Sequence, residues 1–152
     1  MKGIKKLAFG TDHAASEIRN SVIKYLQDIG YDVEDLGFCG HTSCDYPDYA
    51  VKVAEMVACK KAHRGILICG TGIGMCIAAN KVHGVIAAVC WDEDTAKLAA
   101  QHNGANILCL GSRVATVSEV CHRIKTFLET SFEERHIERI TKIKQIEKRQ
   151  CQ

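Results

Sequence analysis

Cys69 is the residue of this sequence whose type and position are best suited to chemistry. It ends an apolar run at 66–69 and precedes a glycine-rich turn at 70–74. Such glycines let backbone N–H groups converge at the beginning of a helix, where they bind an anion or a developing oxyanion. A thiolate beside the turn can act as a base or as a nucleophile. A plainer interpretation stays equally open, in which Cys69 is only the last buried residue of a strand.

The same turn also fits a dinucleotide-binding loop. Gly70, Gly72 and Gly74 follow an apolar run and open a helix. Asp92 comes twenty residues after Gly72, where these loops place an acid that binds ribose. Against this, Met75 stands where the third glycine is expected, and the loop follows the third predicted strand instead of the first. Since the chain is also short for a cofactor domain plus a substrate domain, an NAD-type oxidoreductase is the weaker alternative.

Buried strands and amphipathic helices alternate along the whole chain. Apolar or alternating runs predict five strands, at 7–10, 31–36, 65–69, 85–90 and 106–110. Apolar residues at helical spacing predict helices between the strands, among them 73–81 and 93–102, and a charged final helix at about 133–149. We therefore expect an α/β fold, a three-layer α/β/α domain with a five-stranded parallel Rossmann-like sheet. It takes up residues 1–152 as a single domain.

Polar and ionisable residues gather where the predicted strands end. Cys69 ends the third strand, and the residues after the first and fifth strands include Asp12, His13 and Arg113. Ligands of open parallel sheets bind beyond the carboxyl ends of the strands. We therefore expect the functional site at this edge of the sheet.

Length, charge and hydropathy exclude several classes of function. With 152 residues the chain is the size of one domain, and its formal net charge of +2 gives no broad basic surface for nucleic acid. No apolar run is long enough to span a membrane, and residues 1–7 lack the apolar core of a signal peptide. Several of the nine cysteines lie in apolar runs, as reduced cysteines do. We expect a cytoplasmic protein with neither nucleic-acid nor membrane partners.

Six short segments, in order along the chain, are similar to ribose-5-phosphate isomerase type B, the family shared with the galactose-6-phosphate isomerase subunits. They lie at 10–13, 45–47, 66–74, 78–81, 101–103 and 111–113, so the resemblance covers essentially the whole chain. It implies an aldose–ketose isomerase of the pentose phosphate pathway that interconverts ribose 5-phosphate and ribulose 5-phosphate through an enediolate. It also implies that neither a metal nor an organic cofactor is needed. Isomerases of galactose or allose 6-phosphate, and a sugar-phosphate sensor without turnover, are the alternatives.

The resemblance implies a role for each candidate site residue. Cys69 would carry the proton between two neighbouring carbons, and Thr71 with the backbone of the turn would stabilise the enediolate. His102 would donate a proton to open the furanose ring. Contacts with the substrate would come from Asp12, His13, Tyr46, Gly70, Gly72, Ile73, Gly74, Asn103, Arg113, Arg135 and Arg139. In this set the arginines would bind the phosphate.

Glu133 and Glu134 depart from the family's pattern, which usually has glycines at this place. They precede Arg135, which stands four residues before Arg139. Two arginines on one helix face repel each other by about a few tenths of a kcal/mol unless an anion lies between them, which favours a phosphate site. The two acids oppose an anionic ligand. Whether Arg135 keeps a phosphate role is therefore an open question.

His102 raises a problem of topology. The helix that it ends starts at the carboxyl edge of the sheet, so His102 should lie near the other edge, far from Cys69. A two-fold dimer solves this by pairing His102 of one subunit with Cys69 of the other. We therefore expect a homodimer or a dimer of dimers with shared active sites. The final helix carries a wide apolar stripe that packs either on its own domain or on the partner subunit: Ile137, Ile140, Ile143 and Ile146.

Overall fold

Strands and helices alternate from one end of the chain to the other. The structure, a computed structural model, describes residues 5–37 and 40–149. Its strands are β1 (Lys6–Thr11), β2 (Asp32–Asp35), β3 (Arg64–Cys69), β4 (Ala87–Val89) and β5 (Ile107–Gly111). Its helices are α1 (Ser16–Asp28), α2 (Tyr46–Ala58), α3 (Ile73–Ala79), α4 (Glu93–Gln101), α5 (Val117–Glu129) and α6 (Ile137–Glu147), with 3₁₀ turns at His13–Ala15 and Glu134–His136. Over these described residues, none of the helices is both long and apolar enough to cross a lipid bilayer.

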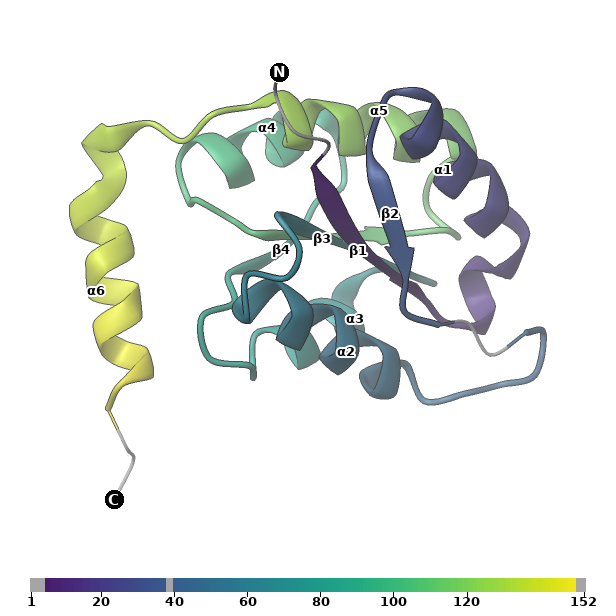
Figure 1. Cartoon of the computed structure of the whole chain (residues 1–152), viewed down its shortest axis with the longest axis horizontal. Coiled ribbons are helices and arrows are strands. Elements are labelled where there is room, and N and C mark those ends of the chain that lie inside the picture. The colour runs from purple at the N-terminus through teal and green to yellow at the C-terminus, as the bar shows by residue number, and fades with distance from the viewer. Residues whose placement is uncertain (1–4, 38–39, 150–152) are drawn as a thin grey trace.

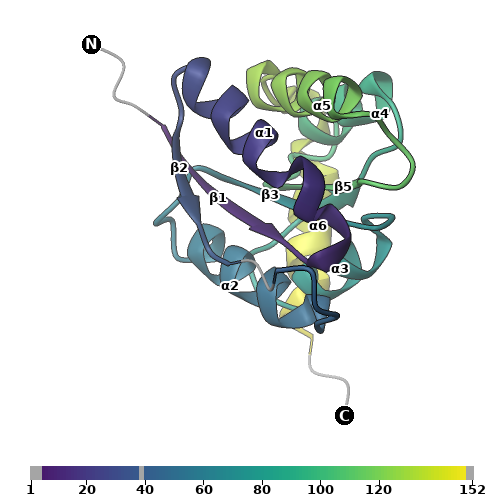
Figure 2. The same cartoon turned by 90° about the vertical axis from the view of Figure 1, so that its right-hand side faces the viewer.

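The five strands form one parallel sheet in the order β2-β1-β3-β5-β4. Thr11 of β1 lies beside Ile68 of β3, and Cys69 of β3 lies beside Gly111 of β5. Helices α1, α4 and α5 cover one face of the sheet, and α2 and α3 cover the other (Figure 1 and Figure 2). The predicted three-layer α/β/α architecture with a five-stranded parallel sheet is confirmed.

Side chains of the central strands alternate between two apolar cores. Ile66 and Ile68 belong to the core under α1, α4 and α5, whereas Leu67 belongs to the core over α2 and α3. Because both faces are covered, β3 is apolar at nearly every position. Gly65 has a packing reason, since a Cβ there would lie 2.8 Å from the Val53 side chain. Glycine therefore lets α2 approach the sheet closely.

The chain crosses opposite faces of the sheet on its way from β1 to β2 and from β2 to β3. Helix α1 connects β1 to β2 over one face, whereas α2 connects β2 to β3 over the other. Such a change of direction between adjacent strands opens a crevice at their carboxyl ends, where ligands bind in this architecture. The residues that follow β1 and β3 therefore lie where a ligand is expected.

Some element ends differ from the sequence-based predictions. The predicted strand at 85–90 is reduced to Ala87–Val89, and the predicted helix at 73–81 ends at Ala79. The strand starts late because the Asn106 side chain accepts from the Ile86 amide and donates to the Gly84 carbonyl, both at 2.8 Å. The helix ends early because the amides of Lys81 and Val82 bond only three residues back, to Ala78 and Ala79. The predicted helix at 133–149 begins instead with a 3₁₀ turn, and α6 covers only Ile137–Glu147. Arg135 and Arg139 therefore do not share one continuous α-helix.

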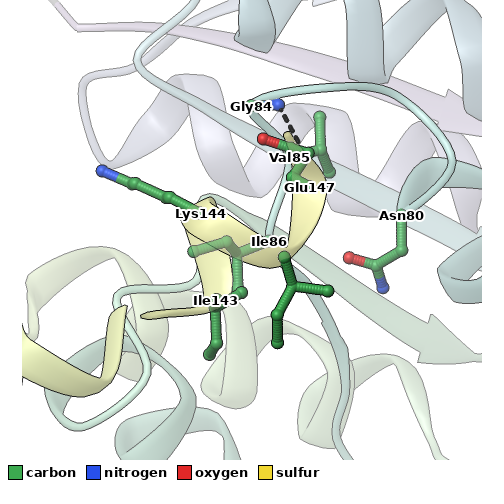
Figure 3. Close-up of a pocket in the computed structure, with 8 residues that line it drawn as sticks. Asn80, Gly84, Val85, Ile86, Ile143, Lys144 and Glu147 are labelled. Carbon is green, nitrogen blue, oxygen red and sulfur yellow. Dashed lines mark hydrogen bonds between the residues drawn. The ribbon is translucent and has the colours of Figure 1, made fainter. Parts of the chain in front are cut away.

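Helix α6 stands at the side of the domain, away from the sheet (Figure 1). Ile140 is buried, but Ile137, Ile143 and Ile146 are 47%, 44% and 61% exposed. A hollow of about 250 Å³ separates α6 from the segment before β4 (Figure 3), and its apolar lining is made of Val85, Ile86, Ile143 and Ile146. The stripe of isoleucines is therefore covered only in part by its own domain.

Candidate active site

Backbone hydrogen bonds tie three neighbouring strand ends together. The amide of Asp12, after β1, donates to the carbonyl of Ile68 at 3.3 Å. The amide of Ser112, after β5, donates to the carbonyl of Cys69 at 2.8 Å. Because β3 lies between β1 and β5, these bonds fix the backbone around Cys69 from both sides.

The Cys69 thiol faces the glycine turn. The residue is 5% exposed, and its sulfur accepts a hydrogen bond from the amide of Gly72 at 3.1 Å. Gly72 has a φ of +82°, and a Cβ there would come within 2.9 Å of the Leu110 backbone. Both its conformation and its surroundings therefore require glycine. The turn thus directs an N–H group at the beginning of α3 toward the sulfur.

The other two glycines of the turn let larger side chains close over it. A Cβ on Gly70 would lie 3.2 Å from the Arg113 guanidinium, and a Cβ on Gly74 would lie 2.5 Å from the Tyr46 ring. The Arg113 amide also donates to the carbonyl of Gly70 at 3.1 Å. The Arg113 guanidinium and the Tyr46 ring therefore flank the glycine turn.

Asp12 and His13 bring polar groups to the same edge from β1. Asp12 is 5% exposed, and its carboxylate accepts a hydrogen bond from the amide of Ala14 at 2.9 Å. The Nδ1 atom of His13 accepts from the amide of Cys44 at 3.3 Å. A backbone N–H can only donate, so a neutral His13 carries its proton on Nε2.

Ser112 is a residue of this site that sequence reasoning missed. Its hydroxyl lies 2.8 Å from the carbonyl of Ala14 and 3.1 Å from the carbonyl of Cys69. Ser112 therefore connects the segments that follow β1, β3 and β5. The residue stands between Gly111 and Arg113 in one of the six segments that carry the family resemblance, which is the signal that could have identified it.

His102 lies at the opposite edge of the sheet from Cys69 of its own chain. It follows α4, and four residues later Asn106 accepts a hydrogen bond from the amide of Gly65, near the amino end of β3, at 2.9 Å. Cys69 ends the same strand, roughly 13 Å from Gly65 at about 3.3 Å per residue. Asn103 is exposed next to His102. One chain therefore does not bring His102 and Asn103 to its own glycine turn.

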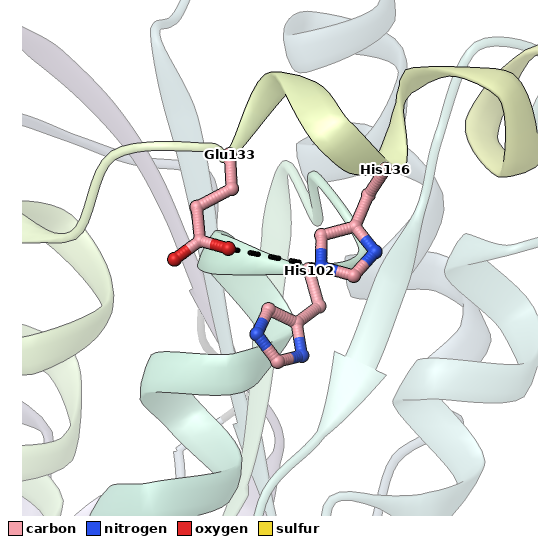
Figure 4. Close-up of side chains that lie close together, drawn as sticks. All are labelled: His102, Glu133 and His136. Carbon is pink, nitrogen blue, oxygen red and sulfur yellow. Dashed lines mark ion pairs between the residues drawn. The ribbon is translucent and has the colours of Figure 1, made fainter.

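Charged groups surround His102 (Figure 4). The rings of His102 and His136 are 4.4 Å apart between centroids. The Glu133 carboxylate accepts from Arg135 Nε at 2.5 Å and lies 3.8 Å from His136 Nε2. The hydrogen bond from Arg135 lowers the pKa of Glu133, whereas burial, followed by the charge of Arg135, lowers the pKa of His136. At neutral pH this cluster therefore combines an anionic Glu133 with a neutral His136.

The same cluster is the group of described residues that comes closest to a metal site. One ligand atom each of His102, Glu133 and His136 lies within 4.8 Å of the others. Arg135 approaches Nε2 of His102 at 3.3 Å, and Arg139 approaches Nδ1 of His136 at 3.1 Å. Guanidinium groups only donate, so the second nitrogen of each neutral ring carries a proton and offers no lone pair to a metal. The donors of this cluster therefore suit an anion better than a cation.

The candidate residues thus form two groups. The carboxyl edge of the sheet brings together Cys69, Gly70, Thr71, Gly72, Ile73, Gly74, Asp12, His13, Tyr46 and Arg113. The second group lies around the end of α4 and the beginning of α6, and contains His102, Asn103, Arg135 and Arg139. The first group offers a thiol beside a glycine turn, and the second offers imidazole and guanidinium groups.

The chain is similar to known proteins over nearly its whole length. The family model described as Ribose/Galactose Isomerase matches residues 7–143. Ribose-5-phosphate isomerase B of Escherichia coli is 40% identical over 147 residues, covering 96% of this chain and 99% of that protein. The structure of ribose-5-phosphate isomerase B from Clostridium thermocellum has a TM-score of 0.91 at 44% identity, covering 94% and 97% of the two chains. The enzyme of Mycoplasma genitalium with bound ribulose-5-phosphate has a TM-score of 0.91 at 42% identity, covering 95% and 97%. The chain belongs to the ribose/galactose isomerase family.

Proposed function

We propose that this protein interconverts ribose 5-phosphate and ribulose 5-phosphate. The observation that carries the proposal is the buried thiol of Cys69, whose sulfur accepts the amide of Gly72 at 3.1 Å in the turn that opens α3. Relatives named ribose-5-phosphate isomerase B match nearly the full length of the chain, and one of their structures contains ribulose-5-phosphate. The alternative of a dinucleotide-dependent oxidoreductase has no comparable support.

Cys69 acts as the base of the reaction. Its thiolate removes the proton from C2 of the open aldose, and the electron pair of that bond forms the C1–C2 double bond of the enediolate. The carbonyl oxygen becomes negative and is stabilised by N–H groups of the turn, with Thr71 at its rim. Cys69 then returns the proton to C1, while the O2 hydroxyl gives its proton to the negative O1 and O2 becomes the new carbonyl oxygen. Such proton transfer by a positioned group contributes roughly 10²- to 10⁴-fold to the rate.

The groups beside the turn bind the rest of the substrate. Asp12 and His13, which follow β1, and Tyr46, which begins α2 beside Gly74, hold sugar hydroxyls. Arg113, whose guanidinium lies over Gly70, contributes positive charge for the phosphate. The residues at 70–74 contribute mainly backbone groups. This set needs neither a metal nor an organic cofactor.

A second copy of the chain completes the site. His102, which opens the furanose ring, and Asn103 lie at the opposite edge from Cys69, together with the phosphate-binding Arg135 and Arg139. A two-fold dimer brings this group to the glycine turn of the partner subunit. The exposed isoleucines of α6 provide apolar surface for such an interface. We therefore assign a homodimer, or a dimer of dimers, with shared active sites.

We also place the enzyme in the cytoplasm. Cys44 is disulfide-bonded, but the six other described cysteines carry free thiols, and this majority of free thiols fits a reducing compartment: Cys59, Cys69, Cys76, Cys90, Cys109 and Cys121.

An isomerase assay with five- and six-carbon aldose phosphates tests the proposed function. The wild type should turn over ribose 5-phosphate faster than galactose or allose 6-phosphate. Cys69→Ser and Cys69→Ala should reduce turnover by at least roughly 10³-fold while ribose 5-phosphate binding, measured by calorimetry, persists. Full activity of Cys69→Ala would remove Cys69 from the mechanism. If the wild type binds ribose 5-phosphate without turnover, the protein is a sugar-phosphate sensor and not an isomerase. Binding of a nicotinamide dinucleotide would favour the oxidoreductase.

A further inference from the structure

The side chain of Arg135 determines which nitrogen of His102 carries a proton. Arg135 Nη2 lies 3.3 Å from Nε2 of His102. A guanidinium has five N–H donors and no acceptor, so Nε2 must be the acceptor of this hydrogen bond. The proton of a neutral His102 is therefore on Nδ1.

Glu133 holds Arg135 in the orientation that this hydrogen bond requires. Its carboxylate accepts from Arg135 Nε at 2.5 Å, and its other oxygen forms a short hydrogen bond with the side-chain amide of Gln101. The Glu133 amide also donates to the carbonyl of Gln101 at 2.8 Å. Gln101 directly precedes His102. Glu133 therefore bonds both to Gln101 and to Arg135, the residue whose guanidinium contacts the His102 ring.

His136 closes the other side of the His102 ring. It is 4% exposed, its Nδ1 accepts from Arg139 at 3.1 Å, and its Nε2 has no hydrogen-bond partner within the described part of the chain. Burial and nearby cations lower its pKa, which keeps the ring neutral. Neutral His136 therefore packs against His102 without adding a charge, and Glu133 is the anion that orders the cluster.

We propose that Glu133 and Arg135 are positioning residues for ring opening: Glu133 orients Arg135, and Arg135 donates to Nε2 of His102, so that Nδ1 presents the transferable proton. This inference rests on the proposed function, in which His102 opens the sugar ring. The proton passes from Nδ1 to the ring oxygen as the bond from that oxygen to C1 breaks with its electron pair. The C1 hydroxyl forms the carbonyl and gives its proton back to Nδ1, so the imidazole is regenerated. Among the described residues Nη1 of Arg135 has no hydrogen-bond partner and can bind the phosphate, so Glu133 does not prevent an anionic substrate from binding.

Two reactions separate ring opening from proton transfer in the test. Net turnover of ribose 5-phosphate requires both steps, whereas exchange of a C1 hydrogen of ribulose 5-phosphate with D₂O requires only the enediolate, because this ketose has no furanose ring. Glu133→Gln should lower net turnover roughly 10- to 100-fold and leave the exchange rate within about twofold. The control is Glu134→Gln, an exposed neighbour, which should change neither rate. Equal losses in both rates, or no loss in either, would overturn the positioning role of Glu133.

The tautomer of His102 supplies a readout that does not depend on activity. Long-range proton–nitrogen NMR correlations of the wild type, with His102→Asn for assignment, should show the proton on Nδ1. Arg135→Met should move a substantial fraction of it to Nε2, whereas Glu134→Gln should not. A proton on Nε2 in the wild type would contradict the inference. If His102→Asn keeps full net turnover, the proposed role of His102 fails instead, and the NMR result still decides whether Arg135 sets its tautomer.

Discussion

The amide of Gly72 points at the sulfur of Cys69, with 3.1 Å between nitrogen and sulfur. The contact exists because Gly72 adopts a φ of +82° at the N-cap of α3, which turns its N–H group back toward β3. In the proposed proton transfer, N–H groups of this turn stabilise the negative charge that develops on the substrate oxygen. A backbone group fixed in this way needs no reorganisation when the charge forms.

Replacing Gly72 with alanine should separate these two groups. The new Cβ would lie 2.9 to 3.0 Å from the Leu110 backbone, and a positive φ is unfavourable for alanine. The substitution should lower the free energy of unfolding by about 1–3 kcal/mol and reduce turnover by roughly 100-fold. Chemical denaturation and the isomerase assay measure the two effects. A folded variant with unchanged turnover would show that the Gly72 amide does not assist the reaction.

Gly74→Ala tests the contact between the turn and Tyr46. The Cβ would lie 2.5 to 2.9 Å from atoms of the Tyr46 ring, which is half-exposed and can move outward. We expect KM for ribose 5-phosphate to rise several-fold, because the displaced ring no longer flanks the site. Tyr46→Leu should also raise KM, but adding Gly74→Ala to it should cost little more. If the effects of the two substitutions on KM simply add, contact with the Tyr46 ring is not the reason why residue 74 must be glycine.

The fold and the carboxyl-edge site could be predicted because they follow from local patterns. Apolar runs separated by amphipathic helices define the parallel sheet, and the strand ends then place Cys69, Asp12 and Arg113 at one edge. The shortened β4 could not be predicted, because the Asn106 side chain takes the Ile86 amide through a contact between residues twenty positions apart. The start of α6 was missed for a similar reason. Glu133 bonds to Gln101, thirty-two residues earlier, and this pairing fixes a 3₁₀ turn in front of α6.

Cys76 should be alkylated more readily than the buried thiols of Cys90, Cys109 and Cys121. A hydrogen bond from Cys109 lowers the pKa of Cys76 to about 7, whereas burial raises the pKa of Cys90 to about 11 and also raises that of Cys121. The pKa of Cys109 lies well above its ordinary value. Because the thiolate reacts, labelling of Cys76 by iodoacetamide should rise steeply from about pH 6 to about pH 8 and then level off.

Peptide mass spectrometry after short labelling at about pH 7 measures this order. Cys109→Ala removes the hydrogen bond, so the rise in Cys76 labelling should move to higher pH. Cys90 should stay unlabelled in both proteins. Equal labelling of Cys90 and Cys76 in the folded wild type would contradict the environments assigned to these two thiols.

Charge on the isoleucine stripe of α6 should dissociate the subunits. Ile143 and Ile146 are 44% and 61% exposed, so an aspartate at either position disturbs little of the subunit's own core. The double substitution should lower the sedimentation coefficient to that of a monomer and abolish turnover, since the proposed site is completed by a second chain. Gln145→Asp adds a charge to the opposite side of the same helix and should change neither property. A monomeric variant with full turnover would disprove the shared site.

Mixing two inactive variants tests the shared site most directly. Cys69→Ala and His102→Asn should each be inactive as homodimers. If the site takes Cys69 from one subunit and His102 from the other, a mixed dimer has one site with both substitutions and one site with neither. Random exchange makes half of the dimers mixed, so activity should recover to roughly a quarter of the wild-type value. Co-expression with two different affinity tags isolates the mixed dimer, whose activity should approach about half of wild type. If each site instead lay within one chain, both sites of the mixed dimer would carry one substitution, and no activity would return.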